Sequence, residues 1–104
     1  MYGTIFRIRI TPGRAAAVDA AIRGWLRDRA PDVAGFIAEY ILTPDGPPGE
    51  RLALVIFDSE ANYRRNAADP VQHAWYEQFR AHPDADPECH DGPVTEFMRA
   101  TVPL

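Results

Sequence analysis

The chain has 104 residues, enough for a single core, and we expect residues 1–104 to form one domain. With 46% hydrophobic and 25% charged residues, its composition is that of a folded globular protein and excludes a disordered chain. The formal net charge of -4 argues against a nucleic-acid partner, which requires a basic surface, and the absence of lysine excludes a lysine Schiff base.

The first predicted element is a strand over residues 2–10. Alternate residues of a strand share one face. Here one such face is mostly apolar and consists of Tyr2, Thr4, Phe6, Ile8 and Ile10. This alternation lacks the unbroken apolar stretch of a signal peptide, and no segment approaches the roughly 20 apolar residues of a membrane span. We therefore expect a cytoplasmic protein without a membrane partner.

A helix and a strand hairpin are predicted next. Thr11 can cap the helix, Pro12 suits its first position, and Pro31 ends it. An apolar stripe at helical spacing includes Trp25. The segments "VAGFIAEYILTP" and "RLALVIFDS" then read as two strands joined by the proline- and glycine-rich turn "PDGPPGE".

A second helical region is predicted to begin at Ser59. Asp69 followed by Pro70 should divide it in two, because proline has no amide to bond and disfavours helix before it. The residues expected to face the sheet are Tyr63, Ala67, Val71, Ala74 or Trp75, and Phe79. A different stripe carries Asn62, Asn66, His73 and Tyr76.

The segment "ECHDGP" places Cys89, His90 and Asp91 side by side, and these residue types serve nucleophilic and metal-assisted catalysis. We interpret it as a connector, because neighbouring side chains on an extended chain point in different directions and Asp91-Gly92 favours a turn. His90 could instead line the mouth of a pocket. No zinc-ligand spacing is present, so we expect no metal site. The last strand is predicted in "VTEFMRATV".

The order β-α-β-β-α-β predicts an α+β, ferredoxin-like fold with a four-stranded antiparallel sheet and both helical regions on one face. The strands "FIAEYIL" and "LALVIF" are apolar on both faces. We therefore expect the second face to be covered by the same face of another subunit, which makes the protein a homodimer.

Three segments, "MYGTIFRIRITPG", "LALVIFDSEANYRRNAADPVQHAWYEQF" and "PVTEF", resemble the antibiotic biosynthesis monooxygenase family of dimeric α/β barrels. The resemblance spans almost the whole chain, and its most specific part is the serine-containing helix start followed by "ADP" and an aromatic-rich helix. It implies a cofactor-independent monooxygenase that acts on a small, hydrophobic, aromatic polyketide-like molecule.

Such a reaction requires aromatic walls, a general base and hydrogen-bond donors. The base turns the substrate into an electron-rich enolate, which passes an electron to oxygen without flavin or metal. The candidate catalytic residues are His73, Asn66 and Asn62. The candidate substrate-binding residues are Trp25, Tyr63, Trp75, Tyr76 and His90. Imidazole titrates near pH 6.5, which suits His73 as the base, while the aromatic residues equally suit a packed core.

Haem-degrading members of the family use an asparagine on the first strand and a tryptophan and a histidine on the second helix. Here the approximate positions hold Arg7, Asn66 and Tyr76, which disfavours haem as a cofactor. Asn66 also stands where anthrone-oxidising members carry a tryptophan. Two alternatives therefore stay open: a cofactor-free cyclase or lyase on the same fold, and a non-catalytic dimer that binds a small hydrophobic molecule.

Overall fold

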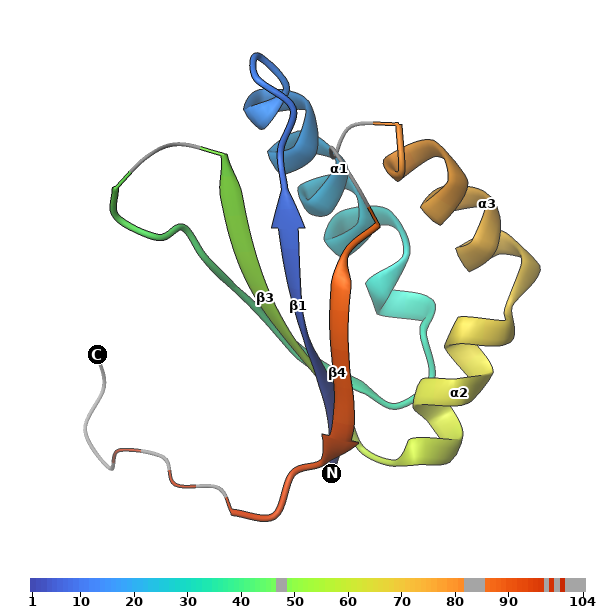
Figure 1. Cartoon of the computed structure of the whole chain (residues 1–104). Helices are drawn as coiled ribbons and strands as arrows, with labels where there is room; N and C mark the ends of the chain where they lie inside the picture. Colours follow the sequence, from blue (N-terminus) through green and yellow to red (C-terminus); the bar gives the residue numbers. More distant parts are fainter. Residues whose placement is uncertain (47–48, 82–85, 97, 99, 101–104) are drawn as a thin grey trace.

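The computed structural model describes residues 1–46, 49–81, 86–96, 98 and 100. In chain order the elements are β1 (Tyr2–Arg9), α1 (Ala15–Asp28), the short 3-10 helix η1 (Ala30–Asp32), β2 (Phe36–Leu42), β3 (Glu50–Phe57), α2 (Glu60–Ala68), α3 (Pro70–Phe79) and β4 (Glu88–Pro93). The four strands form one antiparallel sheet in the order β2-β3-β1-β4. Figure 1 shows α1, α2 and α3 together on one face of this sheet. The predicted ferredoxin-like α+β fold is confirmed.

The alternation predicted for β1 is also confirmed. Tyr2, Thr4 and Ile8 are buried toward the helices, whereas Ile5 is exposed on the opposite face. Ile8 packs with Ile10, Val18, Ile22 and Phe79 in the main hydrophobic core. Each such side chain contributes about 1.5–3 kcal/mol on burial, so β1, α1 and α3 are held together chiefly by the hydrophobic effect.

The start of α1 differs from the prediction. The helix begins at Ala15 after Arg14, and not at Thr11 and Pro12. Gly13 adopts a φ of +84°, which is left-handed, and the Arg14 amide donates to the Thr11 carbonyl oxygen at 2.9 Å. The sequence "TPG" therefore makes a turn that delivers the chain to the helix, because a left-handed residue cannot form part of a right-handed first turn.

The division of the second helical region is confirmed. The Ser59 hydroxyl accepts the Asn62 amide at 3.2 Å and caps α2, while Asp69 ends α2 and caps α3 by accepting the Val71 amide at 2.8 Å. The break rotates α3 relative to α2. Phe79 is consequently buried against the sheet as predicted, but Val71 is 56% exposed and the prediction for it was wrong.

The last strand lies earlier than predicted. Residues 88–93, interpreted from sequence as a connector, form β4 and pair with β1 from Tyr2 opposite Pro93 to Arg7 opposite Glu88. The described residues of the predicted strand, 94–96, 98 and 100, have no regular secondary structure. β4 is an edge strand, where proline and glycine are tolerated because one side needs no ladder hydrogen bonds. Asp91 is therefore a strand residue and not part of a turn.

The sheet face opposite the helices carries several exposed apolar side chains. Ile5, Tyr40 and Leu42 are 51%, 60% and 56% exposed there. They are neighbours in the sheet, since Leu54 pairs with both Ile5 and Tyr40, and Leu52 pairs with Leu42. Within the described part of the chain, no helix is long and apolar enough to cross a membrane.

Candidate functional site

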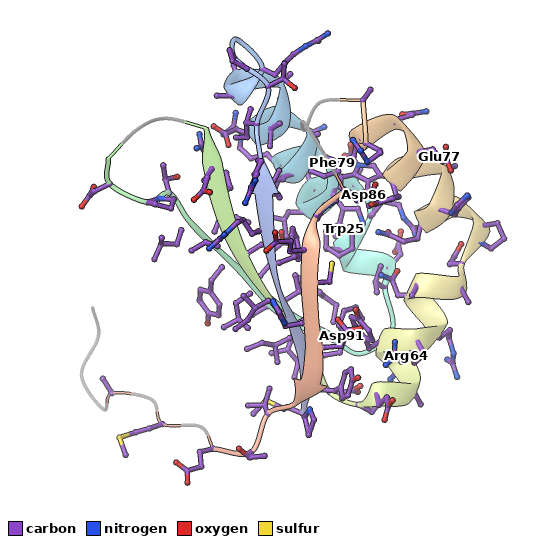
Figure 2. All side chains as sticks on the ribbon, in the orientation of Figure 1. Trp25, Arg64, Glu77, Phe79, Asp86 and Asp91 are labelled. Carbon is purple, nitrogen blue, oxygen red and sulfur yellow. The ribbon has the colours of Figure 1, made fainter. Side chains whose placement is uncertain are left out.

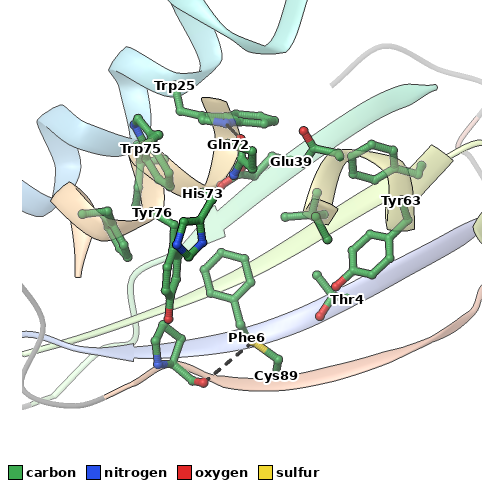
Figure 3. A pocket seen from close by; sticks show the side chains of 17 residues that line it. Thr4, Phe6, Trp25, Glu39, Tyr63, Gln72, His73, Trp75, Tyr76 and Cys89 are labelled. Atoms are coloured by element: carbon green, nitrogen blue, oxygen red, sulfur yellow. Dashed lines mark hydrogen bonds between the residues drawn. The ribbon is translucent and has the colours of Figure 1, made fainter. Parts of the chain in front are cut away.

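A pocket of about 330 Å³ lies between the sheet and the helices. Its volume is at the lower end of the roughly 300–1,000 Å³ typical of small-molecule sites. The aromatic side chains of described residues that line it are Phe6, Trp25, Phe57, Tyr63, Trp75, Tyr76 and Phe79. Figure 3 shows five of them, Phe6, Trp25, Tyr63, Trp75 and Tyr76, around the space between the helices and the strands. The pocket can therefore receive a small aromatic molecule, on whose faces such rings pack.

The aromatic wall is held in place by contacts between α1 and α3. Trp75 stacks on Phe79 with ring centroids 5.1 Å apart and planes 10° apart, and Trp25 lies 6.4 Å from Trp75. The Trp25 Nε1 donates a hydrogen bond of 2.6 Å to the Gln72 Oε1. Figure 2 shows Trp25 and Phe79 between the sheet and the helices. The hydrogen bond fixes the Trp25 ring, so this wall is preformed.

Glu39 introduces a carboxyl group into the pocket from β2. Burial raises the pKa of Glu39 to about 7. A β-bulge determines its direction: Phe36 pairs with Phe57, but Ala38 pairs with Ile56 and Glu39 with Val55, so the strand contains one extra residue between Phe36 and Ala38. Regular alternation from Phe36 would place Glu39 on the opposite face of the sheet. The bulge turns it toward the helices.

Asn66 contributes the second unusual polar group of the pocket. Its side-chain Oδ1 is buried and has no hydrogen-bond partner among the described residues. A buried carboxamide oxygen without a donor is unfavourable by about 1–3 kcal/mol. The position is therefore suited to a ligand that brings a hydroxyl or N–H donor.

Tyr63 is positioned by a network that joins α2 to β4. The Tyr63 hydroxyl donates to Asp91 Oδ1 at 3.0 Å, and Arg64 lies 3.5 Å from Asp91 Oδ2 while donating to the Tyr2 hydroxyl at 2.9 Å. Arg64 and Asp91 face one another in Figure 2. Burial and the neighbouring Asp91 raise the pKa of Tyr63 to about 12, so its phenol stays protonated. Asp91 thus holds β4 against the helix that carries Asn66.

His73 lies at the mouth of the pocket. Its side chain is 68% exposed, and its Nε2 lies 3.1 Å from the Glu77 Oε1. Tyr76 and Cys89 also line the pocket, and burial raises the pKa of both side chains. The Cys89 Sγ lies 3.7 Å from the Pro87 carbonyl oxygen. Neither the phenol nor the thiol is therefore activated for proton loss near neutral pH.

Six of the residues proposed from sequence line the pocket: Asn66, His73, Trp25, Tyr63, Trp75 and Tyr76. The structure does not place Asn62 or His90 in its lining. The Asn62 Nδ2 donates to Asp58 Oδ1 at 2.9 Å at the start of α2, close to Gly35. His90 pairs with Ile5 and belongs to a shallow cleft that includes Leu54.

Sequence reasoning missed Glu39, Gln72 and Cys89. Cys89 pairs with Phe6 in the sheet, so assigning residues 88–93 to a strand would have placed it in the pocket. No local signal distinguishes Gln72 from a surface residue. No group of three or more histidine, cysteine, aspartate or glutamate residues that could hold a metal ion occurs within the described ranges.

The fold and this pocket define a small ferredoxin-like α+β protein with an aromatic-lined pocket between its sheet and its helices. Its fold is that of antibiotic biosynthesis monooxygenases. SnoaB, a cofactor-independent oxygenase from Streptomyces nogalater, superposes with a TM-score of 0.78 at 15% identity, covering 95% of this chain and 97% of that chain. A proposed antibiotic biosynthesis monooxygenase from Deinococcus radiodurans superposes with a TM-score of 0.80 at 12% identity, covering 98% of this chain and 100% of that chain. A further one, from Chloroflexus aurantiacus, is 22% identical with a TM-score of 0.72, covering 93% and 96%. No protein-family model and no curated protein sequence matches the chain.

Proposed function

We propose that the protein is a cofactor-independent monooxygenase that acts on a planar, aromatic, polyketide-like small molecule. The observation that carries this proposal is an aromatic pocket of about 330 Å³ that contains a carboxyl group and an unsatisfied carboxamide oxygen. The structural likeness to SnoaB, which is a cofactor-independent oxygenase, supports the same class of reaction for this protein.

The reaction balances without a cofactor. An anthrone carries a CH₂ group activated by a ketone and aromatic rings, and removal of one proton leaves an enolate. The enolate reduces molecular oxygen and forms a hydroperoxide on the same carbon, which then loses water to give a second ketone. One CH₂ group and one O₂ molecule thus yield one C=O group and one H₂O molecule. The protein must bind the rings, move protons and exclude bulk water.

The proposed roles follow from where the side chains lie. Trp25, Trp75 and Tyr76 contact the aromatic rings of the substrate, while Asn66 accepts a hydrogen bond from a substrate hydroxyl. His73, at the mouth, exchanges protons between the pocket and solvent. Replacing His73 by alanine is therefore expected to lower the rate of turnover without abolishing binding.

The test is oxygen uptake by metal-free and flavin-free protein with anthrone, after subtraction of spontaneous oxidation. Ala67 and Ala61 provide a matched pair, because both are exposed on α2 but only Ala67 lines the pocket. Ala67→Phe is expected to reduce uptake at least about tenfold, and Ala61→Phe is expected to leave it unchanged. Equal uptake by the two variants would contradict a reaction in this pocket.

Other outcomes identify the alternatives. Both tryptophans line the pocket, so their fluorescence reports ligand binding. Saturable quenching without oxygen uptake or product would indicate a binding protein. Product formation under anaerobic conditions would indicate a cyclase or lyase.

We further propose that the protein is a homodimer, formed through the sheet face that carries Ile5, Tyr40 and Leu42. An apolar patch of this kind is expected to be covered by another subunit, and identical faces associate through a two-fold axis. Sedimentation velocity at micromolar concentration tests this proposal. The wild-type protein and Ala20→Arg, on the exposed face of α1, should be dimeric, while Leu54→Arg should be monomeric. A monomeric wild-type protein would contradict it.

A further inference from the structure

We propose that Glu39 is the general base of the pocket, which removes the proton from the activated carbon of the bound substrate and later returns it. This inference rests on the proposed function and assigns its proton-transfer step to a residue on β2. It differs from the expectation drawn from sequence, in which His73 is the base.

The position of Glu39 in the sheet supports this role. The β-bulge after Phe36 places Glu39 opposite Val55 on the sheet face that also carries Thr4, and all three of Glu39, Val55 and Thr4 line the pocket. Figure 3 shows Glu39 directed into the pocket on the side of Trp25 and Gln72. A substrate stacked on this wall would lie within reach of the carboxyl group.

The fold makes no use of the Glu39 carboxyl group. Asp19 forms hydrogen bonds of 3.1 Å with the Arg51 guanidinium, and Asp91 accepts the Tyr63 hydroxyl. Glu39, by contrast, has no hydrogen bond or ion pair with any described residue. A desolvated carboxyl group without a partner opposes folding, and groups of this kind are concentrated in functional sites.

Among the ionisable groups that face the pocket, Glu39 is the best suited to accept a proton at neutral pH. Burial raises the pKa of Tyr63, Tyr76 and Cys89, so these side chains keep their protons at neutral pH. His73 is exposed at the mouth and lies beside Glu77, which is on the outer side of α3 in Figure 2. The pKa of Glu39 is about 7 because of burial, which is close to the optimum for a group that both accepts and donates a proton at neutral pH.

The chemistry can be written for an anthrone-type substrate. The Glu39 carboxylate takes one proton of the CH₂ group, and the electron pair of that C–H bond remains on the substrate as the enolate. Oxygen adds to the enolate carbon, and the protonated Glu39 returns its proton to the peroxide anion to give the hydroperoxide. The Glu39 carboxylate then takes the remaining C–H proton, the electron pair of that bond forms the C=O bond as the O–O bond breaks, and the departing hydroxide leaves as water with the proton from Glu39. The unpaired Asn66 Oδ1 favours substrates that also carry a hydroxyl group. The inferred substrate class is therefore a neutral, hydroxylated aryl ketone with an acidic CH₂ group.

The test measures proton removal separately from oxidation. Anthrone is incubated with the protein in D₂O without oxygen, and loss of the CH₂ proton signal is followed by NMR. The wild-type protein is expected to accelerate this exchange over buffer, and Glu39→Gln, which keeps the shape but not the base, should reduce the acceleration by about 100-fold or more. Glu60 carries an exposed carboxylate on α2, so Glu60→Gln is the matched control and should accelerate the exchange of anthrone as much as the wild-type protein does. Tryptophan quenching should show that Glu39→Gln binds anthrone within about threefold of wild type.

Each outcome has a distinct meaning. Exchange that is equally fast in Glu39→Gln and wild type would overturn the role of Glu39, even if oxygen uptake is observed. Exchange that depends on Glu39 without any oxygen uptake would leave Glu39 as the base and overturn the monooxygenase proposal. Failure of the wild-type protein to bind anthrone or to accelerate its exchange would overturn both.

Discussion

Glu39 should make the stability of the protein depend on pH in a predictable direction. Its pKa rises from an ordinary value of 4.5 to about 7 in the folded state. Between these two pH values the folded protein holds more protons than the unfolded chain, so the free energy of unfolding falls as the pH rises. At about 1.4 kcal/mol for each pH unit, the total loss is about 3 kcal/mol and is complete slightly above pH 7.

Glu39→Gln removes this dependence. The variant should match the wild-type protein at pH 4, where the carboxyl group is neutral in both states, and exceed its stability by about 3 kcal/mol at pH 8.5. For a domain of this size, a difference of about 3 kcal/mol raises the melting temperature by roughly 10 °C or more.

Urea unfolding, followed by tryptophan fluorescence at pH 4, 5.5, 7 and 8.5, measures this effect at one fixed protein concentration, because association would also shift the transition. Other groups titrate in the same range, so the decisive quantity is the difference between Glu39→Gln and wild type at each pH. Glu60→Gln serves as the control and should show no trend of this kind. A difference that stays within about 0.5 kcal/mol from pH 4 to pH 8.5 would refute the reasoning that Glu39 is desolvated in the pocket.

Three further predictions concern contacts around the pocket and the core. Gln72→Met should lower the free energy of unfolding by about 1–3 kcal/mol, because the Trp25 N–H loses its acceptor, and unchanged stability in urea would count against this hydrogen bond. Asp19→Ala should lower the free energy of unfolding by about 2 kcal/mol, because the Arg51 side chain, only 12% exposed, then keeps its charge without a partner. A double-mutant cycle with Arg51→Met should show that the two substitutions are coupled. Cys89 should react with a disulfide reagent at pH 8 more slowly than free cysteine, since burial raises its pKa and the thiolate is the reactive form, and a faster reaction would contradict this.

Several features could be predicted from sequence because they depend on residues close together in the chain. The alternation in β1, the Ser59 cap and the break at Asp69 and Pro70 are all confirmed. Each follows from local chemistry: which face a side chain occupies, which side chain can accept an amide hydrogen, and which residue cannot donate one.

The prediction placed the last strand too late in the chain, because the segment with the higher strand propensity is not the segment that pairs with β1. "VTEFMRATV" is richer in strand-forming residues than "ECHDGP", yet the latter pairs with β1. An edge strand needs only one bonded neighbour, and Asp91 anchors it through Tyr63 and Arg64 on α2. Those partners are separated from Asp91 by 28 and 27 positions, so no local pattern reveals them.

The order of the elements and the inward direction of Trp25, Tyr63 and Trp75 follow from the amino-acid sequence, because large apolar side chains at regular spacing must face a core. That these rings surround a cavity instead of filling it depends on how closely α1 and α3 approach the sheet, which is a property of the folded chain. The position of Glu39 is likewise a property of the folded chain. The bulge that turns this carboxyl group into the pocket is one extra residue in β2 relative to β3. It exists only when the two strands pair, so the sequence of β2 alone does not reveal it.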